Sequence, residues 1–405
     1  MSVDLRTRFD DEPETVDPVE FFDHRFARLV ATEPALVAAM AALDLRPITI
    51  TVADRAWTLR RDEHGRPGAT AGRADDAQEH WTLTAADAVR VLTDQVTPVG
   101  LMTAGDLQLE RHRIARVMDW WLVLRSLLDR RPIHTPGAVT VDADLARSFT
   151  LADDHAEIAG FLARNGFVHV RGVFTRDEMD QVALDMDAAA PSYRDGDGRS
   201  WWATLADGSR RVVRMQYFDE HSPTVSVLLT SDRMRDIREL GGGGHEARGA
   251  GNRIEALFKP LGVTEGISDI PWHKDCSLGR HSYSCCSLTV GISVTPGGAT
   301  TGQLHALAGS HRALVWPSLL DPATLDLVEV ALPTDTGDVT VHLSCTMHRA
   351  EPPTSGERKV LYTGFALPAR DPETAGAAAR ALYEKSRERA PLTTSQAAAP
   401  LGTAT

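Results

Sequence analysis

Hydrophobic and polar positions follow two different rhythms in the first third of the chain. Apolar residues recur every three or four positions in some stretches, which is typical of helices, and alternate with polar residues in others, which is typical of strands. The pattern predicts a helix, two strands, a helix, and a strand leading into a long helix, over residues 17–43, 48–61, 80–84, 85–95 and 107–131. Thr84 is placed to cap the helix over 85–95. This order predicts a small α+β domain over residues 19–135.

Short extended stretches dominate the chain after residue 150. A helix, a strand and a second helix come first, with Gly166 closing the first helix and Thr175 capping the second. Strand patterns follow, and a last helix ends the series, over residues 210–218, 253–260, 287–295, 338–344, 359–367 and 370–387. Strands at this frequency predict a β-sandwich or barrel. We therefore assign residues 151–388 to a second domain.

The remaining segments are predicted to be connections and ends. Residues 136–150 are punctuated by proline and glycine and predict a linker. Residues 1–18 are acidic with little periodicity and residues 389–405 are low in complexity, so we expect both to be disordered. The run GGGGH at 241–245 lacks the Lys-Ser/Thr of a phosphate loop, and we interpret it as a hinge or lid.

Composition narrows the class of protein. The chain has 405 residues, of which 42% are hydrophobic and 24% charged, as in soluble globular proteins, and its length suits two or three domains. The formal net charge of −13 argues against nucleic-acid binding, which needs a basic face. We find no apolar run of the roughly 18 residues that a membrane span needs and no secretory signal. We therefore expect a cytoplasmic protein, and we assign no oligomeric state.

The four cysteines, Cys276, Cys285, Cys286 and Cys345, are expected to be reduced thiols, because the chain is long and carries no secretory signal. The adjacent pair could serve redox chemistry. We favour the simpler interpretation that both are small buried residues on a strand.

The stretch PWHKDCSLG at 271–279 carries the first candidate chemistry. On an extended strand, residues two apart face the same side, so His273 and Asp275 could offer a nitrogen and an oxygen to one ion. A third ligand must come from another strand, and GDVTVHLSCTMH supplies His348. Two histidines and one carboxylate, with positions left open, form the facial triad of non-haem Fe(II) oxygenases.

Other histidines compete for the third position. His342 shares a face with His348 if no turn separates them, and His311 lies in AGSHR, which is typical of a loop with a backbone-bonded histidine. We favour His348, because it stands at a strand end next to an arginine-bearing strand. His281 and His305 could enter a substrate pocket, although structural roles are the simpler interpretation. Zinc is an alternative metal for the same three ligands.

A dicarboxylate co-substrate needs a cation at its far end. Arg358 begins the strand RKVLYTGF, and a guanidinium can grip a carboxylate with two parallel hydrogen bonds. Arg358 and Tyr362 share the face that we infer to be the interior, whereas Lys359 points the other way. Lys259, in LFKP, could meet a carboxylate of co-substrate or substrate, or could end a strand in solvent.

Five segments in this order resemble the phytanoyl-CoA dioxygenase family of Fe(II)/2-oxoglutarate oxygenases: FLARNGFVHVRGVF, LFKPLG…PWHKD, TTGQLHALAGSHR, GDVTVHLSCTMH and ERKVL. The resemblance spans about residues 155–370. It implies a double-stranded β-helix, or jelly roll, with iron bound by His273, Asp275 and His348 and 2-oxoglutarate held by Arg358. It also implies that O2 and 2-oxoglutarate are consumed, with release of succinate and CO2, to oxidise an unactivated C–H bond.

Two positions qualify the resemblance. Some halogenases of this superfamily carry a small residue in place of the carboxylate ligand, but Asp275 is intact. Hydroxylation, or a related desaturation or cyclisation, is therefore favoured. Two positions after the distal histidine the family often has a polar residue that touches the co-substrate, and here that residue is Ala350.

The segment from Trp81 to Leu128 resembles the sterol-carrier-protein-2-like family in its order of strand, helix, a P…MTAGDLQL strand and closing helix. The resemblance implies an apolar tunnel that holds a lipid or another hydrophobic ligand. Trp120 and Trp121 could line such a tunnel, and simple packing of a helix on a sheet is the plainer interpretation.

These features together predict an α+β enzyme with two domains. A sterol-carrier-like module precedes a jelly-roll oxygenase that hydroxylates a small organic molecule, and the arginine-rich, lysine-poor composition suggests bacterial specialised metabolism. Two alternatives stay open. One is a zinc-type hydrolase or isomerase on the same scaffold, and the other is a non-catalytic lipid-binding protein whose oxygenase domain is degenerate.

Overall fold

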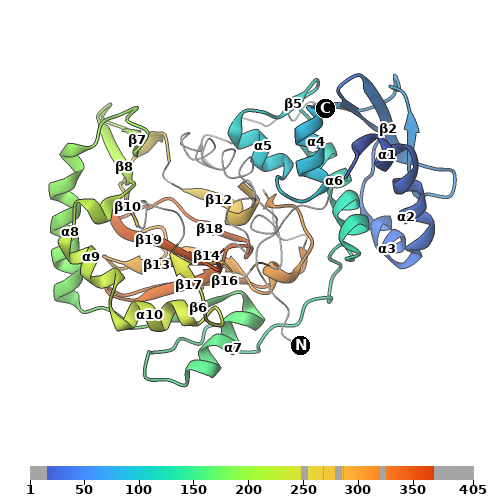
Figure 1. Cartoon of the computed structure of the whole chain (residues 1–405). Coiled ribbons are helices and arrows are strands. Elements are labelled where there is room, and N and C mark those ends of the chain that lie inside the picture. The colour runs from blue at the N-terminus through green and yellow to red at the C-terminus, as the bar shows by residue number, and fades with distance from the viewer. Residues whose placement is uncertain are drawn as a thin grey trace.

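Three β-sheets organise the computed structural model of the chain (Figure 1). The structure describes residues 16–247, 254–267, 269–278, 285, 287–319 and 325–368. The expected disorder at both ends falls outside this part of the chain, apart from residues 16–18, and so do the helix expected over 370–387, His281 and Cys286. Residues 16–18 are described, and α1 begins at Pro18.

A five-stranded sheet and its helices form what we call the N-terminal module, the elements from α1 to α6. The sheet has the order β3-β2-β1-β4-β5, and β1 and β4 are parallel. Its strands are β1 (Ile48–Val52), β2 (Arg55–Arg61), β3 (Pro67–Ala71), β4 (Glu79–Leu83) and β5 (Gln108–Leu109). The helices are α1 (Pro18–Glu20), α2 (Phe26–Thr32), α3 (Pro34–Ala39), α4 (Ala85–Leu92), α5 (Pro98–Ala104) and α6 (Ile114–Asp129), with short turns η1 (Phe21–Arg25) and η2 (Met40–Ala42).

The N-terminal module departs from the expected elements at several points: residues 67–71 form β3, and the helix expected over residues 17–43 is divided into shorter helices. Residues 48–61 form a hairpin and not one strand, because Ala53 takes a positive φ of 54° and reverses the chain between β1 and β2. Residues 98–104 form α5 and not part of a strand. Thr97 caps that helix by accepting from the Gly100 amide, Pro98 is its first residue, and Gly105 ends it at a φ of 76°.

Two facing sheets make up the rest of the described chain. The larger contains β6 (Phe167–Val170), β7 (Ser200–Leu205), β8 (Arg210–Met215), β9 (Glu246–Ala247), β10 (Glu255–Lys259), β11 (Val263–Glu265), β13 (Leu288–Ser293), β17 (Val339–Leu343) and β19 (Arg358–Ala366). The smaller contains β12 (Ile270–His273), β14 (Leu304–Leu307), β15 (Ser318–Leu319), β16 (Glu329–Leu332) and β18 (His348–Ala350). Helices α7 (His155–Asn165), α8 (Arg176–Ala189), α9 (Pro223–Leu229) and α10 (Asp232–Glu239) flank them, with 3-10 turns η3 (Ala190–Ser192), η4 (Phe218–Glu220), η5 (Asp275–Leu278) and η6 (Ser310–Arg312).

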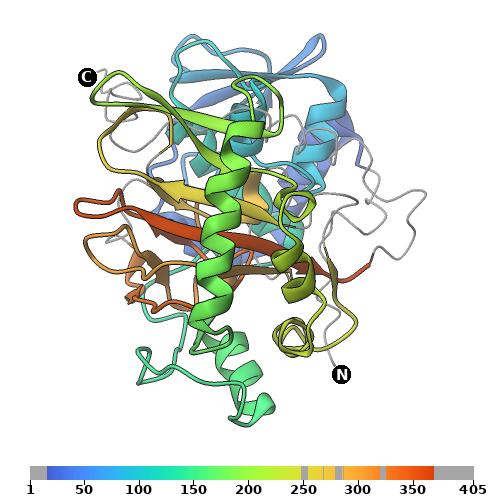
Figure 2. The same cartoon turned by 90° about the vertical axis from the view of Figure 1, so that its left-hand side faces the viewer.

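The strand order is that of a jelly roll. The larger sheet contains the series β10-β19-β13-β17 and the smaller the series β12-β18-β14-β16, so the chain crosses between sheets as it advances. The main hydrophobic core fills the space between the sheets and continues under α8, which runs across the outer face of the larger sheet (Figure 2). The expected caps form here: Thr175 and Glu178 make a reciprocal capping box, and Gly166 closes α7 at a φ of 87°.

The N-terminal module and the jelly roll share buried residues. Leu314 follows η6 of the jelly roll, is 1% exposed, and belongs to the core of the N-terminal module. The Leu314 carbonyl accepts a hydrogen bond of 3.0 Å from the His134 amide. In the described part of the chain, no helix has the length and apolar character to cross a membrane.

Candidate metal centre and anion pocket

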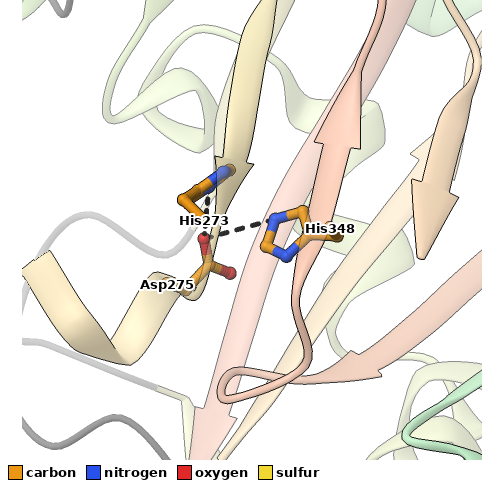
Figure 3. Close-up of side chains that lie close together, drawn as sticks. All are labelled: His273, Asp275 and His348. Carbon is orange, nitrogen blue, oxygen red and sulfur yellow. Dashed lines mark ion pairs between the residues drawn. The ribbon is translucent and has the colours of Figure 1, made fainter. Parts of the chain in front are cut away.

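The first two candidate ligands lie where β12 ends and η5 begins (Figure 3). His273 is the last residue of β12, and Asp275 is the first residue of η5. The expectation that both lie on one extended strand is wrong, because the chain turns at Lys274. The turn still brings the two side chains together, with 3.3 Å between His273 Nε2 and Asp275 Oδ1.

The third candidate comes from the neighbouring strand. His348 begins β18, which pairs antiparallel with β12, and His273 and His348 are register partners. Their ring centroids lie 4.2 Å apart, and His348 Nε2 lies 3.5 Å from Asp275 Oδ1. The three ligand atoms lie within 4.8 Å of one another, and no other metal-sized group of three such side chains occurs among the described residues.

Hydrogen bonds fix which nitrogen each histidine presents. Nδ1 of His273 lies 2.7 Å from the Pro271 carbonyl oxygen, and Nδ1 of His348 lies 2.9 Å from the Thr346 carbonyl oxygen. A carbonyl only accepts, so each Nδ1 carries the proton and donates it. Each Nε2 then carries an unprotonated lone pair on the side of Asp275. A histidine needs such a lone pair to bind a metal. The donor set therefore fits a divalent transition metal.

Oδ2 of Asp275 is held by residues that the sequence did not single out as contacts. The Thr289 hydroxyl donates to this oxygen at 2.8 Å and lies 3.1 Å from the Ser344 hydroxyl oxygen. His342 Nε2 lies 3.3 Å from the same oxygen. Thr289 and His342 are register partners on β13 and β17. Their contacts with Asp275 follow from this strand pairing, which cannot be inferred from a single sequence.

The competing histidines have distinct positions. A turn separates His342 from His348, so the shared-face argument between them does not hold, although their rings still meet at 4.2 Å. His311 is buried against the Ala163 carbonyl at 3.0 Å, as expected for a backbone-bonded loop residue. His305 Nδ1 lies 2.8 Å from Glu329 in an ion-pair arrangement.

The electrostatics suit an ionised Asp275 beside a neutral His348. Burial raises the pKa of Asp275, but the nearby His348 and the contacts with His273 and His342 outweigh it and hold the pKa well below its usual value. Burial and the neighbouring His342 and His273 lower the pKa of His348 well below its usual value. Asp275 is therefore ionised and His348 neutral near pH 7, which are the forms that bind metal.

Two cations face each other at one end of the cavity between the sheets. Arg358 begins β19 and Lys259 ends β10, and the two are register partners. Arg358 is 3% exposed and Lys259 is 7% exposed, so the interpretation of Lys259 as a solvated strand end is wrong. The Gly302 carbonyl accepts from both, at 2.8 Å from Arg358 and 3.3 Å from Lys259, and Glu351 O accepts from Lys259 at 2.6 Å.

The cations line a largely apolar pocket. Its lining residues are Val213, Leu257, Phe258, Lys259, Ile267, Ile270, Ala350, Arg358, Val360 and Tyr362. Arg358 and Tyr362 share this face of β19, as the strand pattern predicts, while Lys359 turns outward and pairs with Asp187 at 2.7 Å. Arg358 Nε has no hydrogen-bond partner and is buried, so a donor in this pocket is free to take an added anion.

Burial strongly lowers the pKa of Lys259, the second cation of the pocket. Burial, then the charge of Arg358, lower the pKa of Lys259 to about 7. Burial raises the pKa of Tyr362, which hydrogen-bonds with Arg358 and stays neutral. The pocket thus holds one permanent positive charge and one that depends on pH near neutrality.

The part of the chain that holds this site matches a known protein family. Residues 162–360 match the profile of the phytanoyl-CoA dioxygenase family. This part of the chain is a phytanoyl-CoA dioxygenase domain. It contains the strands of both jelly-roll sheets up to the start of β19, the three candidate ligands, and the two pocket cations. No curated protein sequence matches the chain significantly.

Several solved structures resemble part of the chain at low identity, each with a TM-score below 0.5. AviO1 from Streptomyces viridochromogenes Tue57 is 20% identical, with 54% of this chain and 97% of that one covered and a TM-score of 0.44. The epimerase SnoN from nogalamycin biosynthesis, crystallised with Fe3+, alpha ketoglutarate and nogalamycin RO, is 18% identical. The match covers 52% of this chain and 83% of that one, with a TM-score of 0.41. EctD from S. alaskensis with bound Fe is 18% identical, with 58% of this chain and 83% of that one covered and a TM-score of 0.43. Likenesses this distant decide nothing about the chemistry of this chain.

Proposed function

We propose that the chain is an Fe(II)- and 2-oxoglutarate-dependent oxygenase that hydroxylates a small organic molecule. The observation that carries the proposal is the convergence of His273 Nε2, His348 Nε2 and an Asp275 oxygen within 4.8 Å, with each Nδ1 already used by a backbone carbonyl. Three ligands on one side leave coordination positions for O2 and the co-substrate.

Each residue of the centre has a defined task. His273, Asp275 and His348 would hold the ion, and Thr289 and His342 would keep Asp275 turned toward it by occupying its other oxygen. When bound, Fe(II) supplies the redox chemistry that couples oxidation of 2-oxoglutarate by O2 to oxidation of a substrate C–H bond. One O2, one 2-oxoglutarate and one C–H bond give an alcohol, succinate and CO2.

The pocket cations are assigned to the co-substrate. Arg358 would grip the far carboxylate of 2-oxoglutarate with a forked pair of hydrogen bonds. Lys259 stands beside it and adds a second positive charge, while apolar neighbours such as Val360 suit the methylene carbons. Hydroxylation is favoured over halogenation because Asp275 occupies the position that a halide would need. Desaturation and cyclisation use the same centre.

Resemblance of the N-terminal module to sterol-carrier-protein-2-like domains stays a proposal. Its five-stranded sheet with flanking helices supports the proposal. Trp120 and Trp121 are both fully buried in the core, and Trp120 donates to the Arg46 carbonyl at 2.7 Å, so they serve as packing residues here. Displacement of a fluorescent fatty acid from the full chain by lipid would support a hydrophobic ligand site.

Succinate formation tests the proposed activity. Under air, the wild-type chain with Fe(II) and 2-oxoglutarate should release succinate across a panel of candidate substrates, with mass analysis identifying an added oxygen in the product. His273→Ala should release none, because the centre loses a ligand. A wild-type chain that retains zinc tightly and releases no succinate would contradict the proposal and favour hydrolysis.

A matched pair of variants tests the anchor. Arg358→Gln should raise the Kd for 2-oxoglutarate about tenfold to hundredfold, because a charge-assisted bidentate contact is lost, and should leave metal affinity unchanged. Lys359→Gln, at the next position but facing Asp187, should leave both unchanged. Unaltered 2-oxoglutarate affinity in Arg358→Gln would remove Arg358 from the anchor role.

A further inference from the structure

A short segment connects the N-terminal module to the metal-binding turn. We call residues 310–319 the bridging segment; they run from η6 to β15. One side of this segment enters the N-terminal module, where Leu314 is 1% exposed within the core. The Trp316 side chain hydrogen-bonds with the carboxyl of Asp119 on α6, and Trp316 packs against both neighbouring cores. The bridging segment is therefore anchored in the module.

The other side of the bridging segment holds the residue between two metal ligands. Lys274 is fully buried, and its ammonium donates to the Ser310 carbonyl at 2.9 Å and to the Ala313 carbonyl at 3.1 Å. Its backbone amide donates to the Pro317 carbonyl at 3.0 Å. His273 is also the register partner of Ser318 in β15. Three carbonyls of the bridging segment thus fix the peptide that separates His273 from Asp275.

A second contact reaches the same turn directly. Helix α5 of the N-terminal module lies against η5, the turn that begins at Asp275. Figure 1 shows α5 on the side of the module that faces β12. The metal-binding turn is therefore flanked by the module on one side and tied through Lys274 to a segment embedded in the module.

We propose that the N-terminal module is a structural part of the metal centre, and that Lys274 is the positioning residue that transmits its support to His273 and Asp275. A module that only delivered a hydrophobic ligand would need no such contacts. Burying an ammonium carries a large desolvation cost, and the carbonyls of the bridging segment help to offset it. Loss of the anchoring in the module should therefore loosen the turn and weaken metal binding.

Metal affinity of full-length variants tests this inference, which rests on the proposed metal centre. Co(II) serves as the probe in place of Fe(II) and is titrated under anaerobic conditions by its visible spectrum. Lys274→Met keeps the length of the side chain but removes the donor, and should raise the Kd for Co(II) about tenfold to hundredfold, the range found when support of a metal ligand is removed. Lys359→Met is the control and should bind as wild type.

A second pair of variants, with smaller changes, tests the contribution of the N-terminal module. This pair remains informative if Lys274→Met does not fold. Trp316→Phe removes the indole donor to Asp119 and should also raise the Kd for Co(II), by several-fold. Trp57→Phe removes the same kind of bond, from Trp57 to Asp23 at 2.6 Å, inside the module and away from the bridging segment. It should leave Co(II) affinity unchanged. Equal affinity in Trp316→Phe and Trp57→Phe would overturn the inference.

Hydrogen exchange adds a readout that does not depend on activity. Co(II) should slow exchange several-fold in peptides covering α5, α6 and the bridging segment of the wild-type chain, and Lys274→Met should lose this effect. Protection confined to the jelly roll would overturn the inference while leaving the metal centre intact. A wild-type chain that binds no Co(II) would overturn the metal centre itself.

Discussion

At the residue scale, the two oxygens of Asp275 have separate partners. Oδ1 lies toward the Nε2 atoms of His273 and His348, whereas Oδ2 is taken by Thr289 and His342. This division turns the carboxylate so that a lone pair faces the histidines. Supporting contacts of this kind are as important to metal affinity as the ligands' own geometry.

The Thr289 hydroxyl should therefore matter although it is no ligand. Thr289→Val keeps the shape and removes the donor, and should raise the Kd for Fe(II) or Co(II) about tenfold. Thr289→Ser keeps the hydroxyl and should bind nearly as wild type. Anaerobic metal titration checks both variants, and equal losses in the two would show that packing and not the hydrogen bond is responsible.

Lys259 should make 2-oxoglutarate binding depend on pH. Its pKa of about 7 means that the ammonium is mostly present at pH 6 and mostly lost at pH 8. Because the bound dicarboxylate is stabilised by the positive form, the Kd should rise as pH increases above 7, by at most about tenfold for each pH unit. Calorimetry from pH 6 to 8.5 measures this slope. Lys259→Met should bind 2-oxoglutarate more weakly, with a Kd that does not depend on pH. A Kd that still rises with pH in Lys259→Met would refute the assignment.

At the element scale, the centre depends on short segments between strands. The Gly302 carbonyl accepts from both pocket cations, and the turn η5 presents Asp275. Gly302 has a φ of +77°, which L side chains rarely adopt, and an added Cβ would lie 2.4 Å from the Glu351 carbonyl oxygen. Only glycine lets the chain approach the cations this closely.

Gly302→Ala should therefore weaken co-substrate binding. Displacing the carbonyls that orient Lys259 and Arg358 should raise the Kd for 2-oxoglutarate by about tenfold or more, a loss on the order of a hydrogen bond to a charged group. Gly298→Ala, where an added Cβ meets nothing within 4 Å, should have no effect. Binding titration compares the two, and an unaffected Gly302→Ala would show that the carbonyl does not position the cations.

The sequence predicted elements best where a pattern was long or a cap was present. Thr84, Thr175 and Gly166 mark helix ends that the structure confirms. The strands β14 and β18 were missed because they are short and almost wholly buried, which leaves no alternation to detect. The sequence motifs indicate the three candidate ligands, although the strand geometry expected at Asp275 is wrong. Thr289 and Ser344 were missed because their roles depend on pairing between distant strands.

At the scale of the whole molecule, the N-terminal module and the jelly roll share a buried contact region. Asp119 lies in it, is 8% exposed, and hydrogen-bonds with Trp316. Burial raises the pKa of Asp119 to about 7, and the nearby Asp44 adds to the effect against the opposing charge of Arg116. An acid of this kind is most stable in its buried site when protonated.

The contribution of Asp119 to the stability of the chain should therefore fall as pH rises from about 4 to 7. Over this range the folded protein holds a proton at Asp119 that the unfolded chain has lost, so the free energy of unfolding decreases, by as much as about 4 kcal/mol. Asp119→Asn cannot ionise and can still accept from Trp316, so its contribution should not depend on pH. Denaturant unfolding at pH 5 and pH 8 compares the two proteins, and identical pH dependence would contradict the raised pKa.

In the proposed centre, three side chains that are distant in sequence hold one ferrous ion with room for a keto acid. Anaerobic titration of the full chain with Fe(II) in the presence of 2-oxoglutarate measures this most directly. One Fe(II) should bind per chain, with a weak visible charge-transfer band that disappears in His348→Ala and is retained in His305→Ala. Absence of the band in the wild-type chain, or its persistence in His348→Ala, would rule out this metal centre.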